Sequence, residues 1–372
     1  MRLVPIDKVK EGYILAKTIF SENGHVLIRE GSVLNISKII KIENFGYHSI
    51  YINDEYSTNY IEDMIDPSTR LRSVKNIRNS FGKFDEYIKE NSKETSVNKW
   101  QLSKLRTNYV NEIKETASTI IDDLLLKRNL SINITDIKQM HDYMYQHSVN
   151  VAVLAVLLGI ELGLNEDKLV DLAIASLLHD IGLKNTSDEI LLKKSELTEE
   201  EFNEVKKHPL DGYEHFKDNV DMSSHIRMAV LTHHEWLDGS GYPNGSKGDK
   251  IPQLGRIIAV CDVYDALTSD RPYRSAYPPN EAIEYMLAMA INQLDTVIVK
   301  KFVNMIIPYP VGTLVKLSNN EVGVVESVPV EFPLRPVIKV VVQSGRGVEL
   351  YNRDLMKERN ILISGVVHEY MT

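Results

Sequence analysis

The 372-residue chain has little cysteine, no long apolar run, and fewer basic than acidic residues. The lone Cys261 excludes a disulfide scaffold and is typical of a reducing compartment, so we expect a cytoplasmic protein. No stretch approaches the roughly 20 apolar residues that cross a bilayer, and the first residues contain no secretory h-region, which predicts no membrane segment. The formal net charge of −9 excludes wholesale binding to polymeric nucleic acid.

What remains is the composition of an ordinary globular protein, with 43% hydrophobic and 26% charged residues. The length suggests about two or three folding units. The hydrophobic pattern predicts a mainly α protein whose helical core is flanked by small β-rich modules. We expect an N-terminal β-rich module at 1–65, a helical connector at 66–130, a helical domain at 131–307 and a C-terminal β module at 308–372.

Short β-type runs between turn residues mark the two terminal modules. In the N-terminal module, the runs 13–16 and 25–28 flank Asn23-Gly24, a dipeptide that predicts a hairpin between them. A further strand is expected at 47–52. In the C-terminal module, strand-like runs occupy 312–317, 322–325 and 337–342.

Helical spacing dominates the connector and the core. The connector is polar, is interrupted near 91–96, and has an excess of basic residues that indicates a solvated helical face more readily than a partner surface. Thr198 and Glu201 have the spacing of a capping box, and Gly163 and Gly182 follow two helices at the position that favours glycine. The core helices are expected at 136–162, 169–181, 223–234, 253–268 and 281–293.

Five histidines and two aspartates of the predicted core together indicate a metal site, which a single histidine would not. A lone histidine on a helix is ordinarily a hydrogen-bonded core residue or a surface residue. His179 and Asp180, however, place polar groups in an otherwise apolar helix end, where an unpaired charge would be costly and a metal ion would relieve that cost. The whole set is His147, His179, Asp180, His208, His233, His234 and Asp262.

The chemistry of this set points to a pair of metal ions. Imidazole and carboxylate ligands without a thiolate set suit iron, manganese or zinc. Seven ligands exceed one tetrahedral site, and they suit two ions about 3.5–4 Å apart with one carboxylate between them. Such a pair holds a hydroxide at neutral pH and grips a phosphate oxygen, which is the chemistry of phosphodiester hydrolysis. No nucleophile motif supports a catalytic Ser-His-Asp triad.

The stretches that contain these residues resemble the HD-GYP family of cyclic di-GMP phosphodiesterases, within the HD superfamily of metal-dependent phosphohydrolases. The resemblance covers about 135 to 307, and the segment from His233 to Pro243 is its most specific part. The matching stretches are His147-Ser148-Val149, His179-Asp180-Ile181-Gly182, His208-Pro209, His233-His234-Glu235, Asp238-Gly239, Gly241-Tyr242-Pro243, Asp262-Val263-Tyr264-Asp265-Ala266-Leu267-Thr268-Ser269 and Arg271-Pro272-Tyr273-Arg274.

This resemblance implies an HD-type helical bundle that hydrolyses cyclic di-GMP to linear pGpG, and in some members on to GMP, through a metal-bridging hydroxide. It implies iron or manganese as the two ions, and a homodimer or a regulatory protein as a further partner. The implied first metal site is His147, His179, Asp180 and Asp262, and Asp180 bridges to a second site of His208, His233 and His234. The implied substrate contacts are Gly241, Tyr242 and Pro243, with Arg271 and Arg274 on phosphate and guanine, a role that suits a forked guanidinium.

Two positions depart from the family pattern. Members usually have a lysine directly after His-Asp-Ile-Gly, whereas this chain has Leu183 there and Lys184 one place later. Lys184 is therefore the candidate to bind the scissile phosphate, and the shift leaves open a low-turnover cyclic di-GMP sensor or partner-docking protein, or an enzyme for another cyclic dinucleotide. Some members bind a third metal ion through a glutamate one helical turn before the first histidine; Tyr143 stands at that position, which favours two ions.

Four neighbouring residues are assigned from their position alone. Asp265 lies one turn after Asp262, so it either orients a ligand histidine or has an ordinary capping or surface role. Glu235 and Asp238 either orient His234 or stabilise the glycine-containing loop. Cys261 is expected to pack as a small apolar residue.

Overall fold

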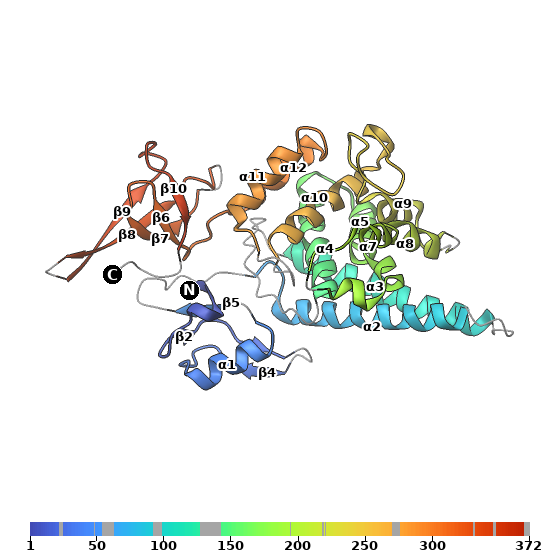
Figure 1. Ribbon diagram of the computed structural model, residues 1–372, viewed down its shortest axis with the longest axis horizontal. Coiled ribbons are helices and arrows are strands. Elements are labelled where there is room, and N and C mark those ends of the chain that lie inside the picture. Colours follow the sequence, from blue (N-terminus) through green and yellow to red (C-terminus); the bar gives the residue numbers. More distant parts are fainter. Residues whose placement is uncertain are drawn as a thin grey trace.

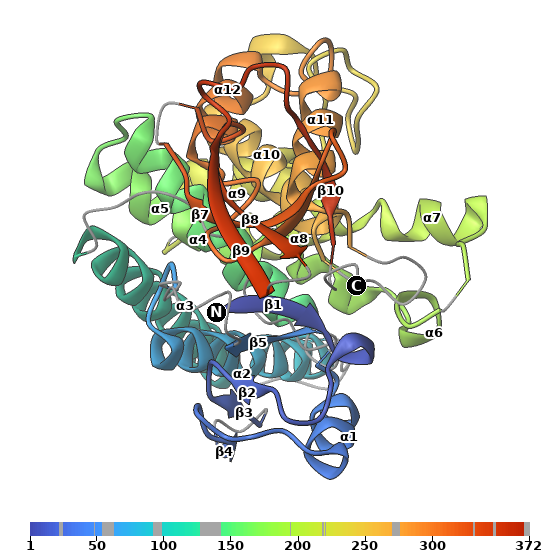
Figure 2. The same cartoon turned by 90° about the vertical axis from the view of Figure 1, so that its left-hand side faces the viewer.

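The computed structural model describes residues 1–21, 25–47, 49–53, 63–91, 99–126, 143–193, 195–217, 219, 221–269, 276–329, 332–344 and 347–367. Helices dominate this part of the chain, with a small sheet module near each end of the sequence, which confirms the predicted mainly α class (Figure 1). The two modules lie at one end of the molecule, and the helical core extends away from them (Figure 1, Figure 2).

The N-terminal module contains two small antiparallel sheets and one α-helix. Its elements are β1 (Arg2–Pro5), η1 (Ile6–Lys8), β2 (Ile14–Leu15), β3 (Ile19–Phe20), β4 (Val26–Ile28), α1 (Ile36–Asn44) and β5 (Ser49–Asn53). The larger sheet has the order β1-β5-β2, with Val4 opposite Ile50 and Leu15 opposite Ile52. These four side chains are fully buried and form the centre of the module's own apolar cluster.

The predicted hairpin between 13–16 and 25–28 is wrong in its first strand. β4 pairs with β3, with Ile28 opposite Ile19, whereas β2 pairs with β5. A tight turn joins the strands that adjoin it in sequence, and β3 lies nearer to the turn than β2 does. β2 instead buries Leu15 against the central strand β5. The predicted turn residues Asn23 and Gly24 lie outside the described residues.

The connector consists of two long helices, α2 (Pro67–Asn91) and α3 (Lys99–Leu126). α2 begins where the Asp66 carboxylate accepts hydrogen bonds from the backbone N–H and the hydroxyl of Ser68, at 2.8 and 2.6 Å. The two helices pack against each other, with the rings of Phe84 and Tyr109 6.2 Å apart in an edge-to-face contact. α2 runs along the underside of the helical core (Figure 1).

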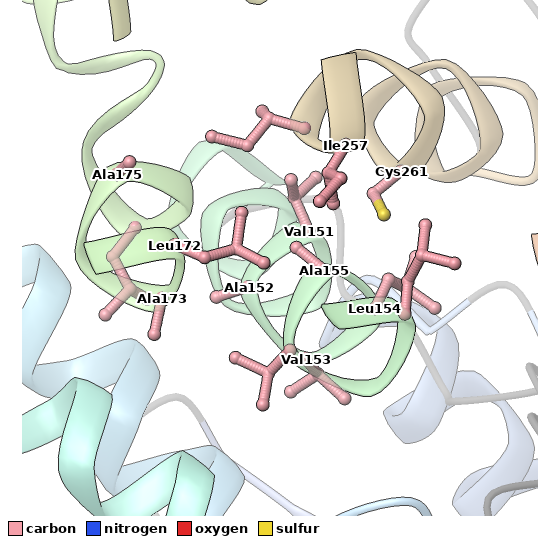
Figure 3. Packing of buried hydrophobic residues seen from close by; sticks show 14 of the residues in the cluster. Val151, Ala152, Val153, Leu154, Ala155, Leu172, Ala173, Ala175, Ile257 and Cys261 are labelled. Atoms are coloured by element: carbon pink, nitrogen blue, oxygen red, sulfur yellow. The ribbon is translucent and has the colours of Figure 1, made fainter. Parts of the chain in front are cut away.

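α4 (Tyr143–Glu161) is the central helix of the core because it is apolar on nearly every side. Residues 147–159 are all buried. Figure 3 shows Val151 and its neighbours packed between α5 (Glu166–Leu178) and α10 (Gln253–Leu267). Among the described residues α4 alone is long and apolar enough to cross a membrane, but 72% of its most apolar window is buried inside the protein. Cys261 of α10 is buried in the same cluster, as predicted, and burial raises the pKa of its thiol well above the usual range.

The other core elements follow the predicted helix signals closely. The Thr198 hydroxyl accepts a hydrogen bond from the Glu201 N–H (3.3 Å), and the Glu201 carboxylate accepts one from the Thr198 N–H (2.7 Å), which confirms the capping box. Gly163 ends α4 with a left-handed φ of +72°. These elements are η3 (Ile181–Asn185), α6 (Asp188–Leu191), α7 (Glu199–Val205), α8 (His208–Phe216), α9 (Ser224–Thr232), η4 (Gly248–Lys250), α11 (Pro279–Met289) and α12 (Thr296–Met305).

Gly182 does not have the predicted role of a left-handed helix cap. It lies within η3 with an ordinary backbone conformation. Glycine is required there for space, because a Cβ at this position would overlap the backbone carbonyl of His208. The close approach holds the start of α8 against the end of α5, and it thereby brings His208 to His179 and Asp180.

The C-terminal module is a five-stranded antiparallel sheet with its own apolar cluster. Its strands are β6 (Leu314–Leu317), β7 (Val322–Ser327), β8 (Val337–Ser344), β9 (Gly347–Asp354) and β10 (Ile363–Val366), in the order β10-β6-β7-β8-β9. The three predicted strands are confirmed. β9 and β10 were not predicted, because charged and polar residues such as Glu349 and Arg353 interrupt the apolar pattern of a strand. At the start of the module, Gly312 leaves room for the backbone carbonyl of Met1.

Candidate metal centre

The five histidines and two aspartates singled out in the sequence converge on one buried site. Each lies in a helix or within two residues of a helix end, so the helical core fixes all of them. Every member except His234 is buried, and His234 is partly buried. The set comprises His147 of α4, His179 and Asp180 after α5, His208 at the start of α8, His233 and His234 after α9, and Asp262 of α10.

Asp180 stands between two groups of ligands. Its Oδ2 lies 3.3 Å from Nε2 of His179 and 3.7 Å from Nε2 of His147. Its Oδ1 lies 3.3 Å from Nε2 of His208. Within each group the ligand atoms lie within 4.8 Å of one another; the first group is His147, His179 and Asp180, and the second is Asp180, His208, His233 and His234. One carboxylate therefore presents one oxygen to each group.

Asp262 also faces both groups. Its Oδ1 lies 3.1 Å from Nε2 of His147, and its Oδ2 lies 3.7 Å from Nδ1 of His234. The first contact places Asp262 beside the first ligand group. The second contact lets the same carboxylate influence the charge of His234.

Backbone carbonyls set the tautomers of three of these histidines. Nδ1 of His179 lies 2.8 Å from the Ser176 carbonyl, Nδ1 of His208 lies 2.8 Å from the Val205 carbonyl, and Nδ1 of His233 lies 2.7 Å from the Val230 carbonyl. Because a carbonyl can only accept, each Nδ1 carries the proton. When such a ring is neutral, its Nε2 therefore directs a lone pair into the site.

These inward lone pairs fit a divalent cation. Nε2 of His208 and Nε2 of His233 lie 3.1 Å apart, although both are acceptors in the tautomers that the carbonyls select. Nε2 of His179 is buried, and within the described part of the chain it has no hydrogen-bond donor. Two lone pairs at this distance repel unless a cation or a proton lies between them. The arrangement could therefore hold a metal ion, and its nitrogen and oxygen donors are those of iron, manganese or zinc.

The second ligand group is pre-set in its metal-binding protonation state. Burial lowers the pKa of His208 and, together with the neighbouring histidines, lowers that of His233 well below the usual range. Burial lowers the pKa of His234 to about 4. These rings are neutral at physiological pH, so they do not have to lose a proton before they bind a cation.

The first ligand group is dominated by the carboxylates. Burial opposes the charged form of Asp180, yet the surrounding histidines hold its pKa well below the usual range. Burial works to lower the pKa of His147 and of His179, but their acidic neighbours outweigh it and raise both. A divalent cation would take the place of these protons as the positive charge between the carboxylates.

A tight loop brings Tyr242 over the second group. The backbone N–H of Tyr242 donates to the carbonyl of His234 (3.0 Å), and its ring centroid lies 4.7 Å from that of His234. Gly241 is required for this approach, because a Cβ there would overlap the backbone of His234 and Trp236. The next peptide bond, between Tyr242 and Pro243, is cis.

Glu235 and Asp238 stabilise this loop, which decides between the two roles left open by the sequence. The Glu235 carboxylate accepts from the backbone N–H groups of Asn244 and Ser246, at 2.7 and 2.8 Å. The Asp238 carboxylate accepts from the N–H and the hydroxyl of Ser240, at 2.8 and 2.6 Å. Both side chains therefore hold the loop that carries Tyr242.

Asp265 orients a ligand histidine, which is one of the two roles that the sequence left open for it. Its Oδ2 accepts a hydrogen bond from Nδ1–H of His147 at 2.7 Å, and the side chain is only 1% exposed. The hydrogen bond orients the ring so that Nε2 of His147 faces Asp262 and the site. On the other side, the ring of Tyr143 stacks on that of His147 at 5.6 Å.

Of the three cations predicted to contact substrate, the structure describes only Lys184. Lys184 forms an ion pair with Asp85 of α2 at 2.9 Å. Arg271 and Arg274 lie outside the described residues. A lysine that sequence reasoning missed lies nearer to the loop: Nζ of Lys206 is 4.5 Å from the ring centroid of Phe202 and 5.9 Å from that of Tyr242. Its position two residues before His208 was the available signal.

The helical core that carries this site is similar to the HD domain. Residues 129–298 match the family model of the HD domain, and residues 314–371 match that of a KOW domain associated with the HD domain. A solved structure, titled as Bd1817, a HDG"Y"P protein from Bdellovibrio bacteriovorus, has a TM-score of 0.53 at 14% sequence identity. The match covers 82% of this chain and 98% of that one, which confirms the HD-type fold.

Curated relatives of this chain are cyclic di-GMP phosphodiesterases. The chain is 38% identical over 228 residues to cyclic di-GMP phosphodiesterase PA4108 of Pseudomonas aeruginosa, a match that covers 60% of this chain and 55% of that protein. It is 33% identical over 208 residues to cyclic di-GMP phosphodiesterase PdeB of Borreliella burgdorferi, which covers 56% of this chain and 55% of that protein. The chain thus spans about half the length of these relatives.

Proposed function

We propose that this protein is a metal-dependent phosphodiesterase that hydrolyses cyclic di-GMP to linear pGpG, with further hydrolysis to GMP as the alternative end point. The observation that supports this most strongly is the position of Asp180, whose two oxygens face two separate ligand groups. The names of the curated relatives support cyclic di-GMP as the substrate. The net charge of the chain is negative, so an anionic substrate depends on local cations at the site.

We further propose that the site takes two divalent ions, iron or manganese. His147, His179, Asp180 and Asp262 would hold one, and Asp180, His208, His233 and His234 the other. When bound, such a pair supplies a nucleophilic water at neutral pH and neutralises the charge on phosphate. The residues of the chain contribute neutral imidazoles, ionised carboxylates and a fixed spacing between the two ligand groups.

In the proposed reaction a water oxygen bonds to phosphorus, and the bond from phosphorus to the 3′ oxygen breaks. The departing oxygen takes up a proton. Asp180 and the two ligand groups fix where the phosphate lies, and Tyr242 covers the His234 side of the site. Burial of the ligands limits bulk water, which strengthens the interactions between the site and the developing charge.

The substrate contacts are proposed on the same basis. Gly241, Tyr242 and Pro243 would shape the pocket, and Arg271 and Arg274 would contact phosphate and guanine. Lys184 is the phosphate contact that the sequence predicts. Its ammonium group is paired with Asp85, however, which favours Lys206 as the lysine that contacts the phosphate. Lys206 has no ion-pair partner within the described part of the chain, and the exposed Phe202 beside it offers a surface on which a purine can stack.

A second candidate function follows from Leu183, which stands where relatives in the HD-GYP family usually have lysine. Without that cation the protein would bind cyclic di-GMP with little turnover and act as a sensor or a docking partner. A third candidate function is hydrolysis of a substrate other than cyclic di-GMP, for instance a mixed cyclic dinucleotide.

The remaining predictions concern the whole protein. We propose that the modules at 1–65 and 308–372, with the connector at 66–130, regulate the domain at 131–307. A homodimer or a regulatory protein partner, and a cytoplasmic location, stay predictions as well.

The test is a hydrolysis assay. The full chain is purified without oxygen, loaded with Fe²⁺ or Mn²⁺, and mixed with cyclic di-GMP or 3′3′-cGAMP, and products are separated by chromatography. We expect pGpG from cyclic di-GMP, loss of turnover with chelator, and no turnover by Asp180→Ala. Asp167→Ala, which removes an exposed carboxylate at the far end of α5, is the matched control. Turnover that survives in Asp180→Ala would refute the proposal, and binding without turnover in the loaded protein would favour the sensor.

A further inference from the structure

A chain of hydrogen bonds leads from the metal centre to the connector helix α2. Nδ1–H of His147 donates to Oδ2 of Asp265 (2.7 Å), and Oδ1 of Asp265 accepts from the side-chain amide of Asn150 (3.1 Å). The carbonyl oxygen of Asn150 in turn accepts from Nη1 of Arg70. Four side chains from α2, α4 and α10 are thus linked in series.

The chemistry of each member fixes the direction of the whole chain. A guanidinium can only donate, so Arg70 selects the orientation of the Asn150 amide in which the carbonyl faces α2. The amide NH₂ must then face Asp265. An ionised carboxylate can only accept, so Asp265 accepts hydrogen bonds from Asn150 and from Nδ1–H of His147, and the Ser269 hydroxyl lies 3.3 Å from its Oδ2. The Nδ1 proton of His147 is thereby held by Asp265, while Nε2 faces Asp262 (3.1 Å) on the side where a metal ion would bind.

Arg70 brings a positive charge to the outer end of this chain. Asp265 is 1% exposed and Asn150 5% exposed, so the carboxylate has left water almost completely. Arg70 is the cation at the other end of the chain, and it lies outside the ligand groups.

The outer end of the chain lies at the contact between α2 and the N-terminal module. Arg70 lines a cavity of about 270 Å³ whose wall is shared by the two parts of the molecule. The module contributes Lys17, Tyr47 and Tyr51 to this wall, and α2 contributes Arg70 and Leu71. The Lys17–Asp63 ion pair, 2.6 Å long, lies in the same wall.

We propose that Arg70 is a positioning residue for the first metal site, and that it raises the metal affinity of that site through Asn150 and Asp265. This inference rests on the proposed metal centre. It assigns to the connector a role that the sequence did not indicate, because a polar helix that precedes the domain gives no sign of which side chain reaches the core. Asn150 lies one helical turn after His147, and that spacing was the only signal.

The test measures metal binding, not turnover. Metal-free full-length protein is titrated with Mn²⁺ by calorimetry, for the wild type, Arg70→Met and Arg70→Lys. Loss of an outer hydrogen-bond partner weakens a metal site by roughly 10–100-fold, and we expect about 10-fold for Arg70→Met at one of the two binding steps. Arg70→Lys keeps the charge and a donor, so its loss is smaller. Arg72→Met, on the exposed face of the same helix, is the matched control and leaves both steps unchanged.

A second readout follows the tautomer itself. In Zn²⁺-loaded protein with ¹⁵N-labelled histidine, NMR shows the proton of His147 on Nδ1 in the wild type, and the Arg70→Met variant weakens that signature. An arginine that served packing alone would lower thermal stability without changing this signal. In an Asn150→Ala background the Arg70→Met change has no further effect on metal affinity, since the chain is already broken.

Three results would overturn the inference: wild-type affinity at both steps in Arg70→Met, an equal loss at both steps, or the same loss with and without Asn150. If Arg70→Met does not fold, Arg70→Gln decides the question by the same criteria. Failure of the wild type to bind Mn²⁺, Fe²⁺ or Zn²⁺ would instead refute the proposed metal centre, so the two failures are distinguishable.

Discussion

The protonation of His234 offers a quantitative test of the metal-free centre. Its ring is held neutral by burial, which lowers its pKa from 6.5 to about 4. In the unfolded chain the same ring takes up a proton near pH 6.5. Between these values the unfolded chain binds a proton that the folded chain rejects, so the free energy of unfolding falls as the pH falls.

The size of this effect follows from the two pKa values. The complete shift corresponds to about 3 kcal/mol, of which about 2.5 kcal/mol is lost by about pH 4.5. His147 and His179 have raised pKa values and act in the opposite direction, because their stabilisation is present below pH 6.5 and is lost as the pH rises. Both remain in a His234→Gln variant, so they largely cancel in the comparison.

The assay is urea unfolding of the wild type and His234→Gln in the presence of chelator, from about pH 7.5 to about pH 4.5. We expect the wild type to lose about 2.5 kcal/mol more than the variant over this range. Part of that difference will arise because the substitution also removes the charge repulsion between His234 and the neighbouring histidines, one of which, His208, lowers the pKa of His234. Parallel pH profiles for the two proteins would show that His234 is not held in the buried, neutral state described here.

Three further substitutions test other parts of the site. Asp180→Asn removes the negative charge that both ligand groups share, and we expect the affinity for both metal ions to fall by more than about 100-fold. Loss of a residue that only hydrogen-bonds to a metal ligand already weakens binding by up to that factor. A normal metal content in the variant would exclude a shared carboxylate. Lys206→Met should raise the KM for cyclic di-GMP by about 10-fold, as expected for the loss of one charge-assisted hydrogen bond. Lys207 pairs with Glu204, so Lys207→Met should leave the KM unchanged. Equal KM values for the two variants would show that Lys206 does not contact the substrate. Gly241→Ala should destabilise the protein by about 1–3 kcal/mol through overlap with the backbone of the loop, and an unchanged melting temperature would contradict that packing.

The ligand set could be predicted from the sequence because ligand chemistry is local. His179 and Asp180 interrupt an apolar helix end, and His233 and His234 are followed by a loop whose glycines permit a close approach. The structure adds what spacing cannot give, namely that the two oxygens of Asp180 face different ligand groups. It also gives Gly182 a different role, because the carbonyl that excludes a side chain there belongs to His208, far along the sequence.

Long-range pairings were the part of the fold that the sequence left undetermined. The sequence paired 25–28 with 13–16, whereas β4 pairs with β3 and Leu15 of β2 is buried against β5. The ends of the hydrogen-bonded chain from His147 to Arg70 are likewise far apart in the sequence. A polar residue on an exposed-looking helix carries no local sign of such a partner.

The most direct test of the central claim is an anomalous diffraction map of crystals loaded with Mn²⁺. We predict two peaks about 3.5–4 Å apart, one beside His147 and His179 and one beside His208 and His233, with Asp180 between them. A map without a peak in this site, or with a single ion that Asp180 does not touch, would contradict the account.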